Sequence, residues 1–156
     1  MRGPAGAAVA LLYGDFECPY CAVAATQLSD ARLRVAFRHF PIRSSHPRAW
    51  AAAAAAEAAA LQSRFWEMHD LLFADQGRLE DPHLWARARR LGLDVEQFDV
   101  DRRSDAVQRR IRRDFEAGVR GGIVTTPTLV VDGVLRAGRI AARTVEELSA
   151  GHAAHL

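Results

Sequence analysis

Residues 8–21 read AVALLYGDFECPYC, and this stretch decides the fold. Its apolar run, residues 8–13, ends at Gly14 and Asp15, a pattern typical of a strand that is buried on both faces. Pro19 then stands where a helix would begin, and residues 22–28 supply good helix formers. Both cysteines are therefore predicted to lie at a turn between a strand and a helix.

The flanking sequence extends this unit. Residues 34–40 alternate and place Val35, Phe37 and His39 on one face, so they predict a second strand and an opening β-α-β unit. From about residue 47 to about residue 118 every signal is helical. Helix starts are expected at Pro47, Phe65, Asp81, Asp94 and Ser104.

The end of the chain returns to strands. Thr128–Val131 and Val134–Ala137 read as strands joined by a two-residue turn at Asp132-Gly133, and a terminal helix is expected from Thr144. We therefore predict an α/β fold in which residues 1–156 form one domain with a helical insertion at about 47–118.

Composition excludes several classes of protein. The 156 residues are 49% hydrophobic and 26% charged, which fits one ordinary globular domain. The formal net charge is only +2, so no nucleic-acid partner is indicated. The longest apolar run, residues 49–56, is much shorter than the roughly 20 residues that span a bilayer, so no membrane insertion is expected.

The first residues superficially resemble a signal peptide. Cleavage after Ala10 would remove the strand that precedes the cysteines, so we interpret this segment as part of the fold. The sequence as given then predicts a cytoplasmic location, and an exported domain whose leader was removed is the alternative.

Cys18 and Cys21 are the two cysteines of the chain. A bridge between them closes too short a loop to stabilise the fold greatly, which leaves redox chemistry or metal binding. A structural zinc site needs four ligands, and no two histidines share a ligand-like spacing on one element, so no metal is expected. The histidines are His39, His46, His69, His83, His152 and His155.

The spacing of the two thiols divides their roles. A thiol attacks a disulfide as the thiolate, and the first turn of a helix lowers a thiol pKa. Cys18 is placed there and is the candidate nucleophile. Cys21, one turn inside the helix, is covered but close enough to resolve a mixed disulfide.

Four motifs together resemble the bacterial DsbA-like thioredoxin-fold oxidoreductases. They are YGDFECPYC at residues 13–21, FRHFP at 37–41, FWEMHDLLF at 65–73 and TPT at 126–128. The resemblance implies a thioredoxin fold (β-α-β and β-β-α) with an all-helical subdomain inserted between its halves, and thiol-disulfide exchange with protein or peptide substrates. No organic cofactor is implied.

The resemblance also implies a set of site residues. Cys18, Cys21 and Pro127 would be catalytic, with a cis peptide bond before Pro127 facing the cysteines. Pro19, Tyr20 and Thr126 would bind substrate, with the Thr126 backbone pairing to an extended segment. Because Tyr20 is neutral where strongly oxidising relatives carry a histidine, we expect the Cys18 thiolate to be less stabilised here.

One position departs from the family. Relatives often carry a buried acidic residue six positions before the first cysteine, as a base for the resolving thiol, and here that position is Leu12. Glu57 is a candidate substitute, although a solvated glutamate is the expectation for an alanine-rich helix. Asp15 and Glu17 are nearer in sequence and are expected to be exposed.

Other notable residues are expected to be structural. His39 and His69 are predicted to be hydrogen-bonded packing residues, and most of the aromatic residues Trp50, Phe65, Trp66 and Phe73 are predicted to lie in the core. The basic cluster of Arg109, Arg110, Arg112 and Arg113 is expected to form a solvated helix face, with Asp105 pairing to Arg109 and Glu116 to Arg112.

Two alternative functions remain open at this point. A glutathione-linked, glutaredoxin-like reductase fits Cys-Pro-Tyr-Cys, although the helical insertion argues against it. A non-catalytic peptide-binding or chaperone module would make the cysteines incidental. The sequence leaves open the direction of exchange and the redox partner.

Overall fold

A computed structural model describes residues 1–151 of the chain, including a four-stranded sheet in the order β2-β1-β3-β4. The strands are β1 (Val9–Gly14), β2 (Arg34–His39), β3 (Thr128–Val131) and β4 (Val134–Ala137). Strands β1 and β2 are parallel, whereas β3 runs antiparallel to both β1 and β4. The predicted β-α-β and β-β-α halves therefore share one mixed sheet.

Seven helices accompany the sheet within residues 1–151. Their bounds are α1 Pro19–Ser29, α2 Ala49–Leu61, α3 Phe65–Ala74, α4 Asp81–Arg90, α5 Val95–Arg103, α6 Asp105–Arg120 and α7 Ala142–Gly151. Helices α2–α6 follow one another between β2 and β3, where the helical insertion was predicted. Helix α6 ends at Arg120 rather than near Gly118, and α7 begins at Ala142 rather than Thr144.

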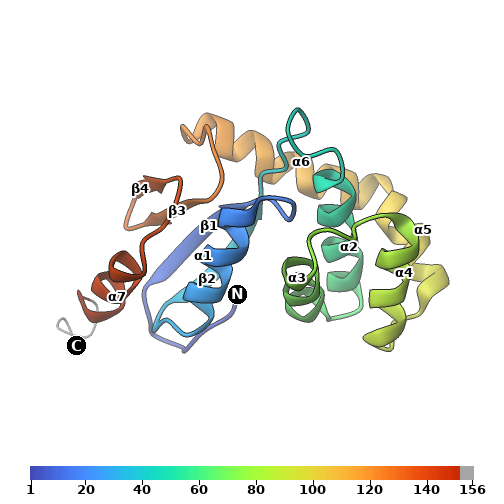
Figure 1. Ribbon diagram of the computed structural model, residues 1–156, viewed down its shortest axis with the longest axis horizontal. Helices are drawn as coiled ribbons and strands as arrows, with labels where there is room; N and C mark the ends of the chain where they lie inside the picture. Colours follow the sequence, from blue (N-terminus) through green and yellow to red (C-terminus); the bar gives the residue numbers. More distant parts are fainter. Residues whose placement is uncertain (152–156) are drawn as a thin grey trace.

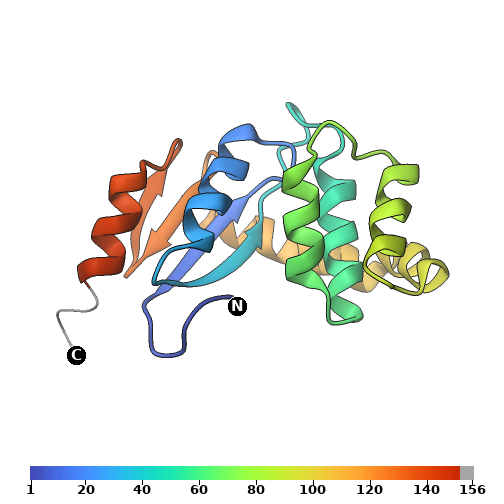
Figure 2. The same ribbon diagram turned by 60° about the horizontal axis from the view of Figure 1, so that its bottom comes forward.

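Two groups of elements lie side by side (Figure 1). The sheet with α1 and α7 forms one group, and α2–α5 form the other. Helix α6 runs along both groups, and α1 and α7 cover the same face of the sheet (Figure 2). Because α6 contacts both α2 and β2, it joins the inserted helices to the sheet.

The core beneath α1 is continuous with the sheet. Leu12 of β1, Leu28 of α1 and Leu129 of β3 belong to one buried cluster, and each has at most 3% of its surface exposed. Burying a leucine side chain stabilises a fold by roughly 1.5–3 kcal/mol. This packing fixes α1, and with it the cysteine turn, against the sheet.

Helix α2 is buried because its side chains are small. Eight of its alanines are buried, and the helix contacts α3, α5 and α6. A helix that is apolar on all sides is stable only inside a protein. The alanine run is thus the centre of the inserted helical group.

Local signals in the sequence are confirmed at several boundaries. Asp94 and Ser104 accept hydrogen bonds at the starts of α5 and α6, as N-cap residues do. Asp132 and Gly133 both have positive φ, of 51° and 75°, which is the backbone of the expected two-residue hairpin turn. Helix α4 begins at Asp81, as predicted, but its N-cap is Glu80 rather than Asp81.

Gly118 allows α6 to approach the sheet closely. A Cβ atom at this position would lie 2.8 Å from the Phe40 ring and 3.0 Å from the Tyr13 ring. One turn earlier, Phe115 stacks on Phe40 with 4.6 Å between ring centroids. The C-terminal half of α6 is therefore held against the end of β2.

Candidate active site

The two cysteines lie at the start of α1, as predicted. Cys18 is the N-cap residue of the helix, Pro19 occupies its first turn, and both thiols are free. The backbone N–H of Cys21 is 3.4 Å from the Cys18 sulfur. Cys21 is fully buried, whereas Tyr20 between the cysteines is 55% exposed.

The environment separates the acidities of the two thiols. A hydrogen bond from the Cys21 thiol, together with backbone N–H groups of Cys21 and Tyr20, lowers the pKa of Cys18 to about 6 although partial burial opposes the shift. Burial raises the pKa of Cys21 far above its ordinary value, and the adjacent Cys18 thiolate raises it further. The pair thus combines a nucleophilic thiolate with a thiol that keeps its proton.

The loop before β3 completes the site. The Thr126–Pro127 peptide bond is cis, which agrees with the family resemblance. The Thr126 carbonyl oxygen lies 3.5 Å from the Cys18 sulfur, and both Thr126 and Pro127 are buried. The structure therefore brings together Cys18, Cys21 and the Thr126–Pro127 loop from opposite ends of the chain.

Asp15 is a residue of this site whose burial the sequence analysis missed. Its backbone N–H points to the Cys21 sulfur at 3.5 Å, and its carbonyl oxygen accepts a hydrogen bond from the backbone N–H of Cys18 at 3.1 Å. The Asp15 side chain is fully buried, so the expectation that it is exposed was wrong.

The Asp15 carboxylate connects the cysteine turn to the loop after β2. One oxygen accepts the backbone N–H of Glu17 at 2.8 Å. The other accepts the backbone N–H of Ile42 at 2.9 Å and lies 2.8 Å from His46 Nδ1. A buried carboxyl group is tolerated when its oxygens are hydrogen-bonded in this way.

Inserted helices also contact the cysteine turn. Gln76, which follows α3, donates hydrogen bonds from Nε2 to the carbonyl oxygens of Phe16 and Cys18 at 2.8 and 2.9 Å. Glu17 is half-buried rather than exposed, and its carboxylate accepts the backbone N–H of Arg48 at 2.6 Å. No local sequence pattern identifies these contacts, because their partners lie about 30 to 60 residues away.

Glu57 is not solvated, contrary to the expectation for an alanine-rich helix. Its side chain is 13% exposed, and one oxygen lies 2.7 Å from His39 Nε2. Burial raises the pKa of Glu57, but the hydrogen bond with His39 and the nearby Arg110 more than offset this effect, so the pKa is lowered overall. The Glu57 carboxylate is thus engaged by β2 and α6.

The histidines and aromatic residues that were expected to be structural lie in or against the core. His39 and His69 are buried in an aromatic cluster with Phe16 and Phe37, which confirms the packing role. Phe65, Trp66 and Phe73 pack against the same core.

The arginine cluster on α6 differs from the expected ion-pair pattern. Arg110 contacts Asp114 and Glu57, while the expected pairs of Arg109 with Asp105 and of Arg112 with Glu116 are absent from residues 1–151. Three of the four arginines, Arg109, Arg112 and Arg113, are nonetheless exposed, as a solvated face requires.

No metal site is formed by the described part of the chain. Among residues 1–151, no three His, Cys, Asp or Glu side chains gather in a way that could hold a metal ion. His152 and His155, two of the candidate ligands, lie outside the described residues. Within the same range, no helix is both long and apolar enough to cross a lipid bilayer.

The fold matches a known family. The family model for the DSBA-like thioredoxin domain matches residues 44–148. The chain belongs to this family. The DSBA family and its structural neighbours are thiol-disulfide oxidoreductases.

Solved structures of DsbA-like proteins superpose on nearly the whole chain. A thioredoxin-like oxidoreductase from Silicibacter pomeroyi is 25% identical, with a TM-score of 0.85 over 100% of this chain and 91% of the other. BdbD from Bacillus subtilis is 18% identical, with a TM-score of 0.81 over 96% of this chain and 90% of the other. The second match concerns the fold alone.

Curated relatives carry a different name. A protein named Na(+)/H(+) antiporter NhaA 1 from Mycolicibacterium vanbaalenii is 42% identical over 97% of this chain, and NhaA from Herminiimonas arsenicoxydans is 44% identical over 93%. The chain spans about a quarter of the length of each, 26% and 24% respectively. The match therefore concerns one segment of these proteins.

The pKa of Cys18 in this DsbA-like chain predicts selective alkylation. Brief iodoacetamide treatment should label Cys18 with a rate that rises through about pH 6 and levels off by about pH 8, because only the thiolate reacts. Peptide mapping by mass spectrometry measures it. The Cys18→Ser variant should remain unlabelled until urea exposes Cys21, and equal labelling of both thiols in the folded protein would contradict the assigned environments.

The absence of a carboxylate at Leu12 predicts slow resolution. Leu12→Glu should speed the attack of Cys21 on a preformed Cys18 mixed disulfide near neutral pH, because a buried base could take the Cys21 proton, at a stability cost of roughly 1–3 kcal/mol. Stopped-flow release of a fluorescent thiol measures the rate. Leu12→Gln is the matched control. Glu57→Gln should leave the rate unchanged, and a slower Glu57→Gln would mean that Glu57 already supplies the base.

Proposed function

We propose that the chain exchanges disulfides with protein or peptide substrates through the Cys18–Cys21 dithiol. The observation that carries the proposal is the placement of Cys18 as the N-cap of α1 beside the Thr126 carbonyl oxygen, with Cys21 buried in the first turn of the same helix. A nucleophile and a protected resolving thiol are the two groups that such exchange requires.

In the reducing direction, the Cys18 thiolate attacks one sulfur of a substrate disulfide. A Cys18–substrate bond forms, and the other substrate sulfur leaves as a thiolate that takes a proton. Cys21 then loses its proton and attacks the Cys18 sulfur, which releases the second substrate thiol and leaves the Cys18–Cys21 disulfide. The oxidising direction is the reverse of these steps.

The Thr126–Pro127 loop is proposed to align the substrate. The Thr126 backbone beside the Cys18 sulfur would pair with an extended substrate segment in the manner of an added strand. Pro127 has no N–H and adds no competing donor there. Pro19 and Tyr20, which follow Cys18 in the chain and are exposed, would contact the same segment.

Compartment would decide the direction of exchange. A cytoplasmic chain, the location expected from the sequence as given, would meet a reducing thiol pool and act as a reductase, whereas an exported one would act as an oxidase or isomerase.

The relatives that carry the antiporter name are longer proteins, and this chain spans about a quarter of their length. We propose exchange chemistry, rather than ion transport, for the segment that this chain represents.

Trapping of a mixed disulfide on Cys18 tests whether the chain exchanges disulfides with peptides. Cys21→Ser should accumulate a mixed disulfide between Cys18 and a disulfide-bonded peptide, because no resolving thiol remains to release it. Non-reducing mass spectrometry identifies the adduct and its site, and Cys18→Ser is the control that should form none. A peptide-binding module would instead bind the peptide equally well in both variants without any covalent adduct.

A further inference from the structure

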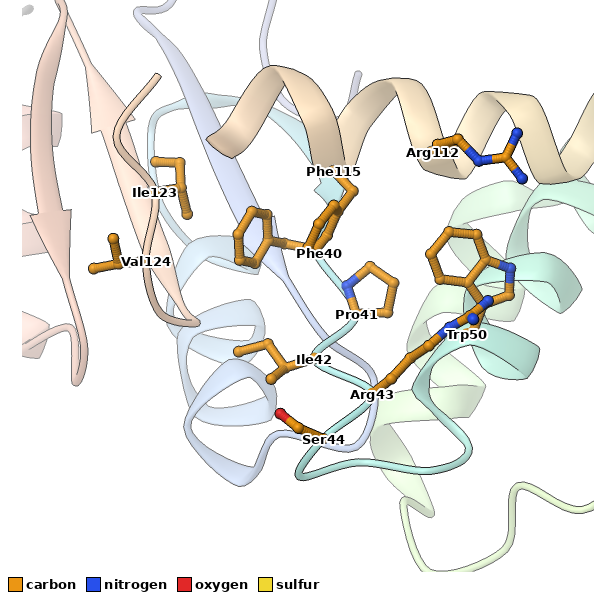
Figure 3. Close-up of a pocket in the computed structure, with 10 residues that line it drawn as sticks. All are labelled: Phe40, Pro41, Ile42, Arg43, Ser44, Trp50, Arg112, Phe115, Ile123 and Val124. Atoms are coloured by element: carbon orange, nitrogen blue, oxygen red, sulfur yellow. The ribbon is translucent and has the colours of Figure 1, made fainter. Parts of the chain in front are cut away.

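A cavity of about 580 Å³ lies between the loop after β2, the start of α2, helix α6 and the segment before Thr126. Figure 3 shows Phe40 and Phe115 in its middle, Ile123 and Val124 at one end, and Trp50 and Arg112 at the other. Ligand sites in proteins commonly enclose roughly 300–1,000 Å³ with a mostly apolar lining. The cavity has room for more than one side chain of a bound peptide.

Two chain connections place this cavity beside the reactive thiol. Val124 stands two residues before Thr126, whose carbonyl oxygen is 3.5 Å from the Cys18 sulfur. Ile42, which lines the cavity, donates its backbone N–H to the Asp15 carboxylate of the cysteine turn at 2.9 Å. Since two extended residues span at most about 7 Å, a substrate bonded to Cys18 reaches the cavity within a few residues.

The charges at the cavity are positive and unmatched. The Arg43 guanidinium lies 4.0 Å from the centre of the Trp50 ring, and Arg112 is exposed on α6. Neither arginine forms an ion pair within the described residues. The acidic groups next to Arg112 on α6 are engaged elsewhere, because Asp114 pairs with Arg38 and Arg110, and Glu116 lies 4.0 Å from Arg120.

We propose that this cavity is a substrate subsite that takes an apolar side chain and an adjacent acidic residue, two or three positions from the cysteine bonded to Cys18. The apolar lining of the cavity would bury the apolar side chain, and Arg43 and Arg112 would face the acidic residue. The assignment rests on the proposed function and adds the class of substrate to it.

Peptides that carry one cysteine, blocked as a mixed disulfide with 2-mercaptoethanol, test the subsite. The Cys18 thiolate of the Cys21→Ser variant attacks the peptide sulfur, the Cys18–peptide bond forms, and 2-mercaptoethanol leaves. A symmetric peptide with Phe-Glu two and three residues from the cysteine on both sides should react about tenfold faster than its Ser-Gln counterpart. Phe-Gln and Ser-Glu peptides should fall between them.

Charge variants locate the effect on the protein. In the Cys21→Ser background, Arg43→Gln with Arg112→Gln should remove the preference for Phe-Glu over Phe-Gln, a change of about threefold in rate. Arg113→Gln, one residue along the same helix and outside the cavity, is the matched control and should keep the preference. The rate with hydroxyethyl disulfide should be equal in all variants, which shows that Cys18 itself is unchanged.

The outcomes separate the two proposals. Equal rates for all peptides would overturn the subsite and leave the exchange function standing. No adduct with any peptide or with hydroxyethyl disulfide would overturn the exchange function, and the subsite with it. Sedimentation showing a dimer that Arg112→Gln dissociates would place a second copy of the chain on the cavity and would also overturn the substrate assignment.

Discussion

The buried residue Asp15 is the constraint on which the site depends. Its backbone N–H and C=O contact Cys21 and Cys18, and its carboxylate accepts hydrogen bonds from the loop that follows β2. Leaving any of these buried donors without a partner would cost roughly 1–3 kcal/mol. The Asp15 side chain thus fixes the cysteine turn to the loop that follows β2.

Because this constraint fixes the cysteine turn, the two thiols have different environments and different roles. Cys18 caps α1 and receives the backbone N–H groups of its first turn, while Cys21 is turned into the core beneath the same helix. The same geometry that stabilises the Cys18 thiolate raises the cost of ionising Cys21. A carboxylate near Cys21 would ease the second step, and Leu12, which packs into the core, stands where the family resemblance implies such a group.

The inserted helices do more than lengthen the chain. Gln76 and Arg48 contact the backbone and side chain of the cysteine turn, and Glu57 holds the end of β2 through His39. Helix α6 stacks Phe115 on Phe40 and so forms one wall of the cavity beside the thiols. Thiol positioning is therefore shared between the sheet and the insertion, and the proposed subsite would share substrate selection between them as well.

Periodicity and turn chemistry predicted the strands, the cysteine turn and the 132–133 hairpin because these features are set by neighbouring residues. Family resemblance supplied the cis bond before Pro127, which no local pattern specifies. The burial of Asp15 and Glu57 could not be predicted, because it depends on Ile42, His46 and His39, partners brought in by the tertiary fold. Of the expected arginine pairs on α6, Arg112 with Glu116 is replaced by Arg120 with Glu116, and no contact in residues 1–151 explains the missing pair of Arg109 with Asp105.

A redox equilibrium in glutathione buffers tests the central claim most directly, with the Cys18–Cys21 disulfide quantified by thiol alkylation and mass spectrometry. The account predicts a single two-electron transition within the chain, at a potential nearer roughly −200 mV than the strongly oxidising end near about −120 mV, because Tyr20 adds no positive charge beside the thiolate. If Cys18 and Cys21 formed no intramolecular disulfide over the whole range of buffers, the account would be contradicted.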